Sequence, residues 1–350
     1  MNESLYNQNF FNKLTKEEQN LWINKVFNYY NKSLPLVKYD KKKILKHFNS
    51  LKNNQSFKKI NEYEYIDVDY KFNYVNLCIL SDFYQNKIRM NCYVNKYLKP
   101  YVYYKKNYTK ILHKYFSNLN KYYERGLIIH KLDFINPKNS VNPFYLQNMT
   151  YYDNKFCTVF KPYIFKFLIS IFGNKNTSII DLSSGWGDRL LGTIAIETNV
   201  NMYIGIDPNQ KLFSGYYKMI DDLSQHKNKY FLINKPAENV DFHSLPISFC
   251  NFIFWSPPFW IQEIYDDKNT KQSTSNFKSY EDFEQNFLLF VINNSTSILE
   301  KNGFLILYIG NINYKTFLDG MNNIKNLQFV NNFKIVSDNK TKNYIIYKKY

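Results

Sequence analysis

Two consecutive prolines follow a strongly apolar segment in the run FWSPPFW (residues 254–260). Prolines fix the backbone and have no N–H to donate, so the carbonyls of Ser256 and Pro257 point out of the sheet edge. A serine side chain and such a carbonyl can accept hydrogen bonds from an NH2 group, and Phe259 can stack on the flat molecule that carries it. Ser256, Pro257, Pro258 and Phe259 are therefore the candidate catalytic residues, although a rigid turn would explain this motif alone.

A second motif, IIDLSSGWGDRLL (residues 179–191), joins an apolar segment to a helical pattern through a loop with two glycines. Gly185 and Gly187 let the backbone approach a bulky ligand because no Cβ intervenes, and glycine tolerates positive φ. Asp181, at the end of the expected strand, can anchor a cationic or hydroxyl-bearing group of that ligand. The loop is a poor dinucleotide fingerprint because Leu190 stands where the third glycine belongs.

The next expected strand ends in an acidic residue, Asp207, 26 residues after Asp181. A carboxylate in this place can accept hydrogen bonds from two ribose hydroxyls. The pair Asp207-Pro208 also suits the start of a helix, and both roles can hold together. The two motifs in this order indicate an adenosine-type cofactor. Arg189 either pairs with an acidic neighbour or contacts a phosphate.

The elements that must position these residues alternate between strand and helix after about residue 155. Such alternation predicts a mostly parallel sheet with helices on both faces, and ligands at the carboxyl ends of its strands. Two further strands near the C-terminus indicate an antiparallel hairpin at the sheet edge. Strands are expected at 177–183, 202–208, 229–235, 250–256, 303–310, 327–338 and 339–350, and helices at 161–173, 187–199, 209–223 and 280–299.

The first part of the chain is mainly helical in pattern. A helix is expected over 14–30, where Thr15 and Glu18 have the spacing of a capping box, and 73–86 and 110–126 are further candidates. Residues 61–72 alternate like a strand or an extended segment. Turn residues gather at 136–143. We therefore expect a mostly helical region over residues 1–145 and a second domain over 146–350.

The order of the motifs resembles that of the S-adenosylmethionine-dependent amino-methyltransferases of nucleic acids, which modify adenine N6 or cytosine N4. Their tetrad, Asp/Asn/Ser-Pro-Pro-Tyr/Phe/Trp, is matched by Ser256 to Phe259. With Phe160-Lys161-Pro162 leading into the first helix ahead of the glycine loop, the chain resembles DNA methylase-like proteins of phages and large DNA viruses. The resemblance covers about residues 155–350 and implies a Rossmann-like class I methyltransferase fold with S-adenosylmethionine as cofactor.

The resemblance also implies roles for single residues. Phe160 and Lys161 would line the methionine end of the cofactor, and Asp207 would hold its ribose. Ala237 and Glu238 would lie beside the adenine ring. The remaining cofactor-binding residues implied are Asp181, Ser183, Gly185 and Gly187.

The sequence departs from the family at two points. The loop reads Ser-Ser-Gly-Trp-Gly where many members have Phe-x-Gly-x-Gly, and serine begins the tetrad, which leaves the target atom open. Three functions therefore stand side by side: methylation of a DNA base, methylation of RNA or a protein amide, and nucleic-acid binding without catalysis. In the polar loop 261–279, Glu263, Tyr265 and Gln272 either contact substrate or belong to a surface loop.

The net charge of +17 is distributed unevenly. Residues 1–150 contain 25 Lys and Arg against 11 Asp and Glu, whereas residues 151–350 contain 21 against 18. A general excess of lysine would affect both parts equally. The asymmetry indicates a polyanionic partner for the first part, and nucleic acid, with DNA first, is the simplest one.

The four cysteines, Cys78, Cys92, Cys157 and Cys250, are scattered and have no neighbouring histidine at ligand spacing. This pattern indicates neither a disulfide framework nor a metal site. The N-terminus lacks a signal-peptide pattern, and no apolar run approaches 18 residues. We therefore expect a soluble intracellular protein with no membrane partner and no metal; the sequence does not indicate an oligomeric state.

Overall fold

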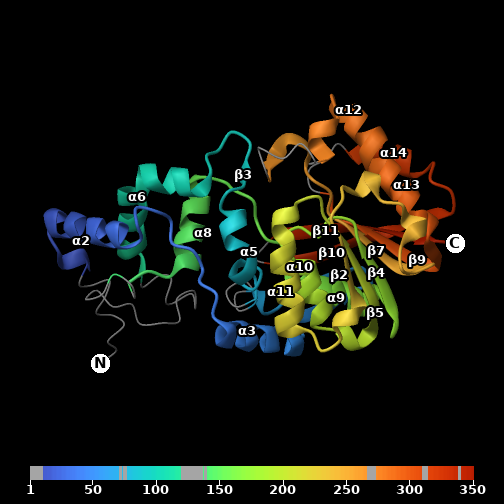
Figure 1. The fold of residues 1–350 in the computed structure, drawn as a ribbon, viewed down its shortest axis with the longest axis horizontal. Helices are drawn as coiled ribbons and strands as arrows, with labels where there is room; N and C mark the ends of the chain where they lie inside the picture. Colours follow the sequence, from blue (N-terminus) through green and yellow to red (C-terminus); the bar gives the residue numbers. More distant parts are fainter. Residues whose placement is uncertain are drawn as a thin grey trace. The chain divides into compact units, whose positions relative to one another are not determined.

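The computed structural model describes residues 11–70, 73, 77–119, 137, 140–265, 273–309, 314–337 and 340–350. The chain forms two compact units that interleave along the sequence (Figure 1). Unit 1 comprises Met1–Tyr39, Asn86–Thr158 and Glu263–Tyr265, and unit 2 comprises Asp40–Gln85, Val159–Gln262 and Asp266–Tyr350. Residues 40–85 thus fold with the C-terminal part, and the turn-rich stretch at 136–143 falls inside unit 1. The division of functions at residue 145 stays a prediction.

Unit 2 is built on a nine-stranded sheet in the order β1-β2-β10-β11-β9-β7-β4-β5-β6. Strands β6, β5, β4, β7 and β9 are parallel to one another, and β11 is antiparallel to both β9 and β10. The seven strands from β10 to β6 have the order and directions of the class I methyltransferase fold, so the expected fold class is confirmed. Their bounds are Thr177–Asp181 (β4), Val200–Ile206 (β5), Tyr230–Ile233 (β6), Cys250–Trp255 (β7), Leu299–Leu307 (β9), Leu327–Ser337 (β10) and Lys340–Lys349 (β11).

Two N-terminal strands extend this sheet beyond the seven expected ones. β2 (Glu64–Asp67) pairs in parallel with β10, and β1 (Phe57–Asn61) pairs antiparallel with β2. Tyr65 of β2 is buried, with its ring 5.0 Å from that of Phe167 and 5.2 Å from that of Phe333. Burial of these aromatic rings is the physical reason that residues 57–67 join the sheet.

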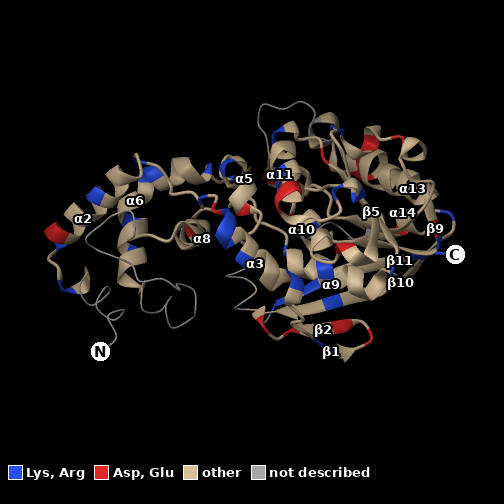
Figure 2. Ribbon diagram, turned by 60° about the horizontal axis from the view of Figure 1, so that its bottom comes forward, with Lys and Arg blue, Asp and Glu red and all other residues tan. Residues whose placement is uncertain are grey.

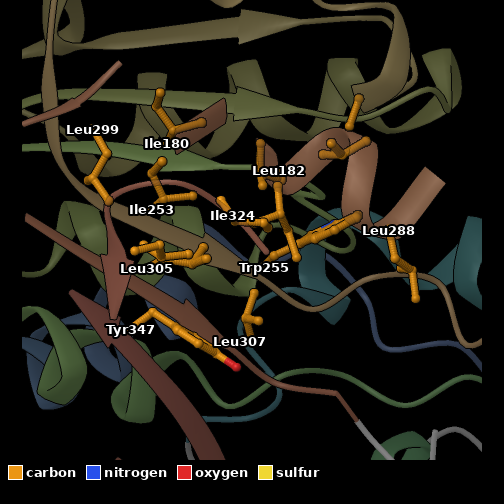
Figure 3. Packing of buried hydrophobic residues seen from close by; sticks show 14 of the residues in the cluster. Ile180, Leu182, Ile253, Trp255, Leu288, Leu299, Leu305, Leu307, Ile324 and Tyr347 are labelled. Carbon is orange, nitrogen blue, oxygen red and sulfur yellow. The ribbon is translucent and has the colours of Figure 1, made fainter. Parts of the chain in front are cut away.

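Alternate residues of the central strands face opposite helical layers. On one face, Ile180, Ile253 and Leu305 belong to a core with Leu288 (Figure 3). That face is covered by α12 (Tyr280–Phe283), the π-helical segment η9 (Glu284–Leu289), α13 (Phe290–Ser297) and α14 (Tyr314–Met321). The other face is covered by α9 (Pro162–Phe172), and α10 (Asp188–Ile194) and α11 (Phe213–Leu223) complete that layer. The helix expected over 280–299 is present but interrupted by the π-helical turn, and α14 was not expected.

The N-terminal part of unit 2 contributes α3 (Lys41–Asn53) and the start of α5 (Asp82–Arg89), which continues into unit 1. The Nζ of Lys166 on α9 donates to the carbonyls of Leu51, Lys52 and Asn54, at 2.9, 2.5 and 3.0 Å. A lysine at these carbonyls satisfies groups that the end of α3 leaves without helical partners.

Unit 1 is mainly helical, as expected. It contains α2 (Lys16–Tyr29), α6 (Pro100–Ser117) and α8 (Pro143–Asp153), with the short pair β3 (Tyr93–Val94) and β8 (Glu263–Ile264). The predicted capping box is confirmed: Glu18 N–H donates to Thr15 Oγ1 at 3.3 Å, and Thr15 N–H donates to the Glu18 carboxylate at 2.8 Å. The helix expected over 110–126 begins earlier, with Pro100 in its first turn, where a proline fits. Of the helix expected over 73–86, residues 74–76 lie outside the described residues; Asn73 is helical, residues 77–81 form a turn, and α5 begins at Asp82.

Candidate functional site

The glycine loop joins β4 to α10, and its two glycines have different surroundings. Gly187 has φ 86° and Gly185 has φ 56°. A Cβ on Gly187 would lie 2.7 Å from the sulfur of Met219, so close packing as well as φ requires glycine there. A Cβ on Gly185 would meet no atom closer than 3.7 Å. At Gly185 a Cβ would make only ordinary van der Waals contact, so the positive φ rather than close packing favours glycine there.

Asp181, at the carboxyl end of β4, is fully buried and bonded within the chain. Its carboxylate accepts hydrogen bonds from Arg189 Nε at 2.8 and 3.0 Å and from Tyr203 Oη at 2.8 Å. Of the two roles left open for Arg189, the structure has the ion pair. These bonds make the side chain of Asp181 hold the base of the loop. The ligand contact expected for Asp181 from the sequence stays a prediction.

Ser183 links the glycine loop directly to the tetrad. Its hydroxyl donates to the backbone carbonyl of Ser256 at 2.7 Å, and Arg189 Nη2 donates to the same hydroxyl at 3.4 Å. The backbone N–H of Leu182 also donates to the carbonyl of Phe254 at 3.1 Å. The loop and the tetrad are thus held against each other at neighbouring strand ends.

Asp207 links the glycine loop to the second acidic motif. Its carboxylate accepts the N–H of Gly185 and the N–H of Asn209, both at 2.9 Å. Burial raises the pKa of Asp207 to about 6. The turn that follows is capped by Asn209, which accepts the N–H of Lys211 at 3.2 Å, so Asp207 is not needed as that cap. Each carboxylate oxygen has a further lone pair for a ligand hydroxyl.

The tetrad presents groups that the chain does not use itself. In the part of the chain that the structure describes, the Ser256 hydroxyl makes no hydrogen bond and the Pro257 carbonyl accepts none. The ring of Phe259 contacts no other ring there. Ser256 and Phe259 are half-buried. A hydroxyl, a carbonyl and a ring in sequence at the end of β7 match what an aromatic amine requires.

Trp260 fixes the far end of the tetrad. Its φ is 50°, an uncommon conformation for a bulky residue. The Trp260 ring lies 4.9 Å from that of Phe283 and 6.4 Å from that of Tyr280, and the backbone N–H of Trp260 donates to the Pro258 carbonyl at 2.9 Å. The tetrad is therefore held by Ser183 at one end and by Trp260 at the other.

Phe160 and Lys161 precede α9. The ring of Phe160 lies 5.5 Å from that of Phe254 and 5.4 Å from the Arg189 guanidinium, so the structure brings Phe160 to the edge that carries the tetrad. Lys161 is buried, with its Nζ 4.2 Å from the ring of Tyr70 and 3.4 Å from Ser337 Oγ.

Ala237 and Glu238 lie in a short turn after β6. Ala237 is buried in the core, and Glu238 lines an open hollow of about 690 Å³ with His243, Ser297 and Lys349. Those three residues lie at the amino ends of β7 and β9 and at the last residue of the antiparallel β11. The hollow therefore occupies the edge of the sheet opposite the tetrad, and an adenine contact by Ala237 and Glu238 stays a prediction.

Several contributors to the site gave no signal in the sequence. Tyr203 bonds Asp181, and the hydroxyl of Tyr216 donates to the Gly185 carbonyl. In a chain with 33 tyrosines, single tyrosines cannot be distinguished by type. Glu263 and Tyr265 lie in unit 1, where their side chains bond each other and burial raises the pKa of Glu263; Gln272 lies outside the described residues.

Among the described residues no helix is long and apolar enough to cross a membrane, and no three His, Cys, Asp or Glu side chains gather as metal ligands.

No protein-family model and no curated protein matches this sequence. Similar solved structures include TrmN from Thermus thermophilus, with 9% identity, a TM-score of 0.40, and coverage of 55% of this chain and 49% of that one. An rRNA methylase from Streptococcus thermophilus has 13% identity, a TM-score of 0.37, and coverage of 55% and 99%. NSun6 from Pyrococcus horikoshii has 13% identity, a TM-score of 0.39, and coverage of 55% and 52%. The matched part thus spans about half the length of TrmN and of NSun6, and the fold assignment rests on the strand order of unit 2.

Proposed function

We propose that this protein is an S-adenosylmethionine-dependent methyltransferase that modifies an exocyclic amino nitrogen of a nucleic-acid base. DNA, at adenine N6 or cytosine N4, is the leading substrate. The observation that carries the proposal is the tetrad: the Ser256 hydroxyl, the Pro257 carbonyl and the Phe259 ring have no partner among the described residues. They stand at a strand end that the glycine loop contacts directly.

The residues at this edge fit the proposed cofactor. Gly185 lies in the loop beside Asp207, and the Asp207 carboxylate, which accepts the Gly185 N–H, keeps acceptor sites for ribose hydroxyls. Ser183, Gly187 and Asp181 shape the loop from within. Phe160 and Lys161 are further proposed cofactor contacts. Ala237 and Glu238 stay the predicted adenine contacts, although Glu238 lines the hollow at the opposite edge of the sheet. S-adenosylmethionine, when bound, supplies an activated methyl group.

The tetrad orients the acceptor. An NH2 group that donates to the Ser256 hydroxyl and the Pro257 carbonyl is held at both hydrogens, which leaves the nitrogen lone pair directed away from them. As positive charge develops on the nitrogen, these two hydrogen bonds strengthen and stabilise it. Phe259 stacks on the base and offsets part of the few kcal/mol that removing a base from a duplex costs.

The direct test combines the purified full chain, labelled S-adenosylmethionine, and unmodified DNA or RNA, followed by mass spectrometry of the nucleosides. We expect N6-methyladenine or N4-methylcytosine in DNA. Label in RNA without label in DNA would replace DNA by RNA as the substrate. Cofactor binding without transfer to either polymer, or to protein, would favour a non-catalytic nucleic-acid-binding protein.

The variant Phe259→Ala tests the tetrad. Stacking of one base on an aromatic ring contributes about 1–3 kcal/mol, so transfer should fall by about 5- to 150-fold while calorimetry shows unchanged cofactor affinity. Phe249→Ala, at an exposed phenylalanine of unit 2, is the matched control and should transfer normally. Normal transfer with weakened cofactor binding in Phe259→Ala would overturn the assignment.

A further inference from the structure

β3, the loop after it and a helix end bring tyrosines and lysines of unit 1 together. Tyr93 lies in β3, the loop after β3 carries Lys96, Tyr97 and Lys99, and Tyr152 and Lys155 lie at the end of α8; Lys96, Tyr97 and Tyr152 are exposed and the other three are half-buried. We propose that these six residues, the tyrosine–lysine patch, bind single-stranded nucleic acid. This inference rests on the proposed function in one respect: the strand bound here would be the substrate that the protein methylates.

The side chain of Asn154 holds the two segments side by side through the backbone of Leu98. Asn154, which is buried, accepts the N–H of Leu98 at 3.0 Å and donates to the carbonyl of Leu98 at 2.8 Å. This reciprocal pair leaves little freedom between the β3 loop and the end of α8. The patch is therefore a preformed surface, and binding to it orders few residues.

Two of its rings are exposed to solvent, and lysines lie beside two of its three rings. Tyr152 is 71% exposed and Tyr97 is 40% exposed. Lys155 Nζ lies 5.6 Å from the centre of the Tyr152 ring, and Lys99 Nζ lies 5.9 Å from that of Tyr93. Lys96, with φ 75°, is exposed at the turn of the loop. Ring faces for bases and ammonium groups for phosphates thus alternate over a short distance.

The charge of unit 1 agrees with an anionic partner. Unit 1 contains 18 Lys and Arg against 7 Asp and Glu, whereas unit 2 contains 28 against 22. Figure 2 shows the basic residues along α2 and α6. The nearest acid in sequence, Asp153, is held by Lys110 at 3.2 Å and Lys114 at 3.8 Å. Most of the charge asymmetry noted in residues 1–150 therefore belongs to unit 1.

The combination favours a single strand over a duplex. Aromatic platforms bind single strands because every unpaired base offers a face to stack on. A duplex keeps those faces covered and would engage only the lysines. In a duplex, the target base must also leave its pair and its stack before its amino group can react. In a single strand the base is already unpaired, so less free energy is needed.

The test measures binding of the full chain to fluorescent 12-nucleotide strands by anisotropy, without cofactor. The probes are oligo-dT, oligo-U and a DNA duplex of equal length. Tyr152→Ala and Tyr97→Ala should each weaken single-strand binding by about 5- to 150-fold. Lys155→Ala should lower the slope of log affinity against log salt by about 0.7. Tyr217→Ala and Lys175→Ala, at exposed positions of unit 2, should change neither.

Thermal unfolding of each variant shows whether unit 1 stays folded. Folded tyrosine variants with full affinity, or equal affinity for duplex and single strand, would overturn the patch. A preference between oligo-dT and oligo-U identifies the polymer, and either one agrees with stacking. Because no methyl transfer is involved, patch-dependent binding by a catalytically inert protein would overturn only the proposed function.

Discussion

Polar side chains are buried at the carboxyl edge of the sheet in unit 2 and exposed or half-buried in the tyrosine–lysine patch of unit 1. At the sheet edge, Asp181, Arg189 and Asp207 are buried and bonded to one another or to the glycine loop. In the patch, Lys96 and Tyr152 are exposed. Atoms that take part in chemistry must be held within fractions of an ångström, whereas a polymer can be held by many weak, solvated contacts.

The comparison predicts that substitutions at the sheet edge lower both the stability of the protein and the rate of methyl transfer. Substitutions in unit 1 should change stability without changing that rate. Four substitutions test this difference.

Arg189→Met should have the largest effect. It leaves the Asp181 carboxylate buried without its counter-charge, which typically costs about 3–5 kcal/mol of unfolding free energy. Urea denaturation of wild type and variant measures the loss. The double variant Arg189→Met, Asp181→Leu removes both charges and should recover most of it. A loss below about 1 kcal/mol in the single variant would contradict a structural role for the pair.

Asp207 should make stability depend on pH. Its pKa is raised from 3.8 to about 6 by burial, so the native protein binds this proton more tightly than the unfolded chain does. Stability from this group is therefore greatest below about pH 4, falls as pH rises to about 6, and then levels off. Relative to Asp207→Asn, which cannot titrate, the wild type should lose about 3 kcal/mol across that range. Equilibrium unfolding of both proteins at several pH values checks this, and a difference independent of pH would refute it.

Ser183→Ala removes the hydrogen bond to the Ser256 carbonyl. We expect a loss of about 1 kcal/mol in stability and about tenfold in transfer, because the tetrad is then held at one end only. Initial rates at saturating cofactor, beside a denaturation curve, provide the comparison. Unchanged transfer would show that Trp260 alone suffices to position the tetrad.

Thr15→Ala should have the smallest effect. The loss of this N-cap in unit 1 costs about 0.5–1 kcal/mol of helix stability. Cofactor affinity and the rate of transfer to a free nucleoside should not change, which makes Thr15→Ala the control for Ser183→Ala. A matching loss of transfer would mean that the two regions are not separable.

Periodicity and strand-end motifs predicted the parts of the fold that depend on local sequence. The seven strands, the N-cap at Thr15 and the position of Asp207 all follow from short-range patterns. The partners of Asp181 could not be predicted in the same way, because Tyr203 is 22 residues away and one of many tyrosines. The pairing of β2 with β10 joins residues about 270 positions apart, and no local pattern indicates such a partner.

The two extra strands also determine how the sheet ends. β10 has 11 residues and would otherwise be a long open edge, a template on which a second chain can add a strand and begin to aggregate. β2 covers residues 334–336 of that edge, and the new outer strand, β1, is short and carries exposed Lys58 and Lys59, which discourage further pairing. A fragment cut to start at residue 146 would keep every motif of the proposed active site and lose this cover. Residues 57–67 thus protect part of the sheet edge from further strand pairing, and shortened forms of the protein should begin no later than residue 40.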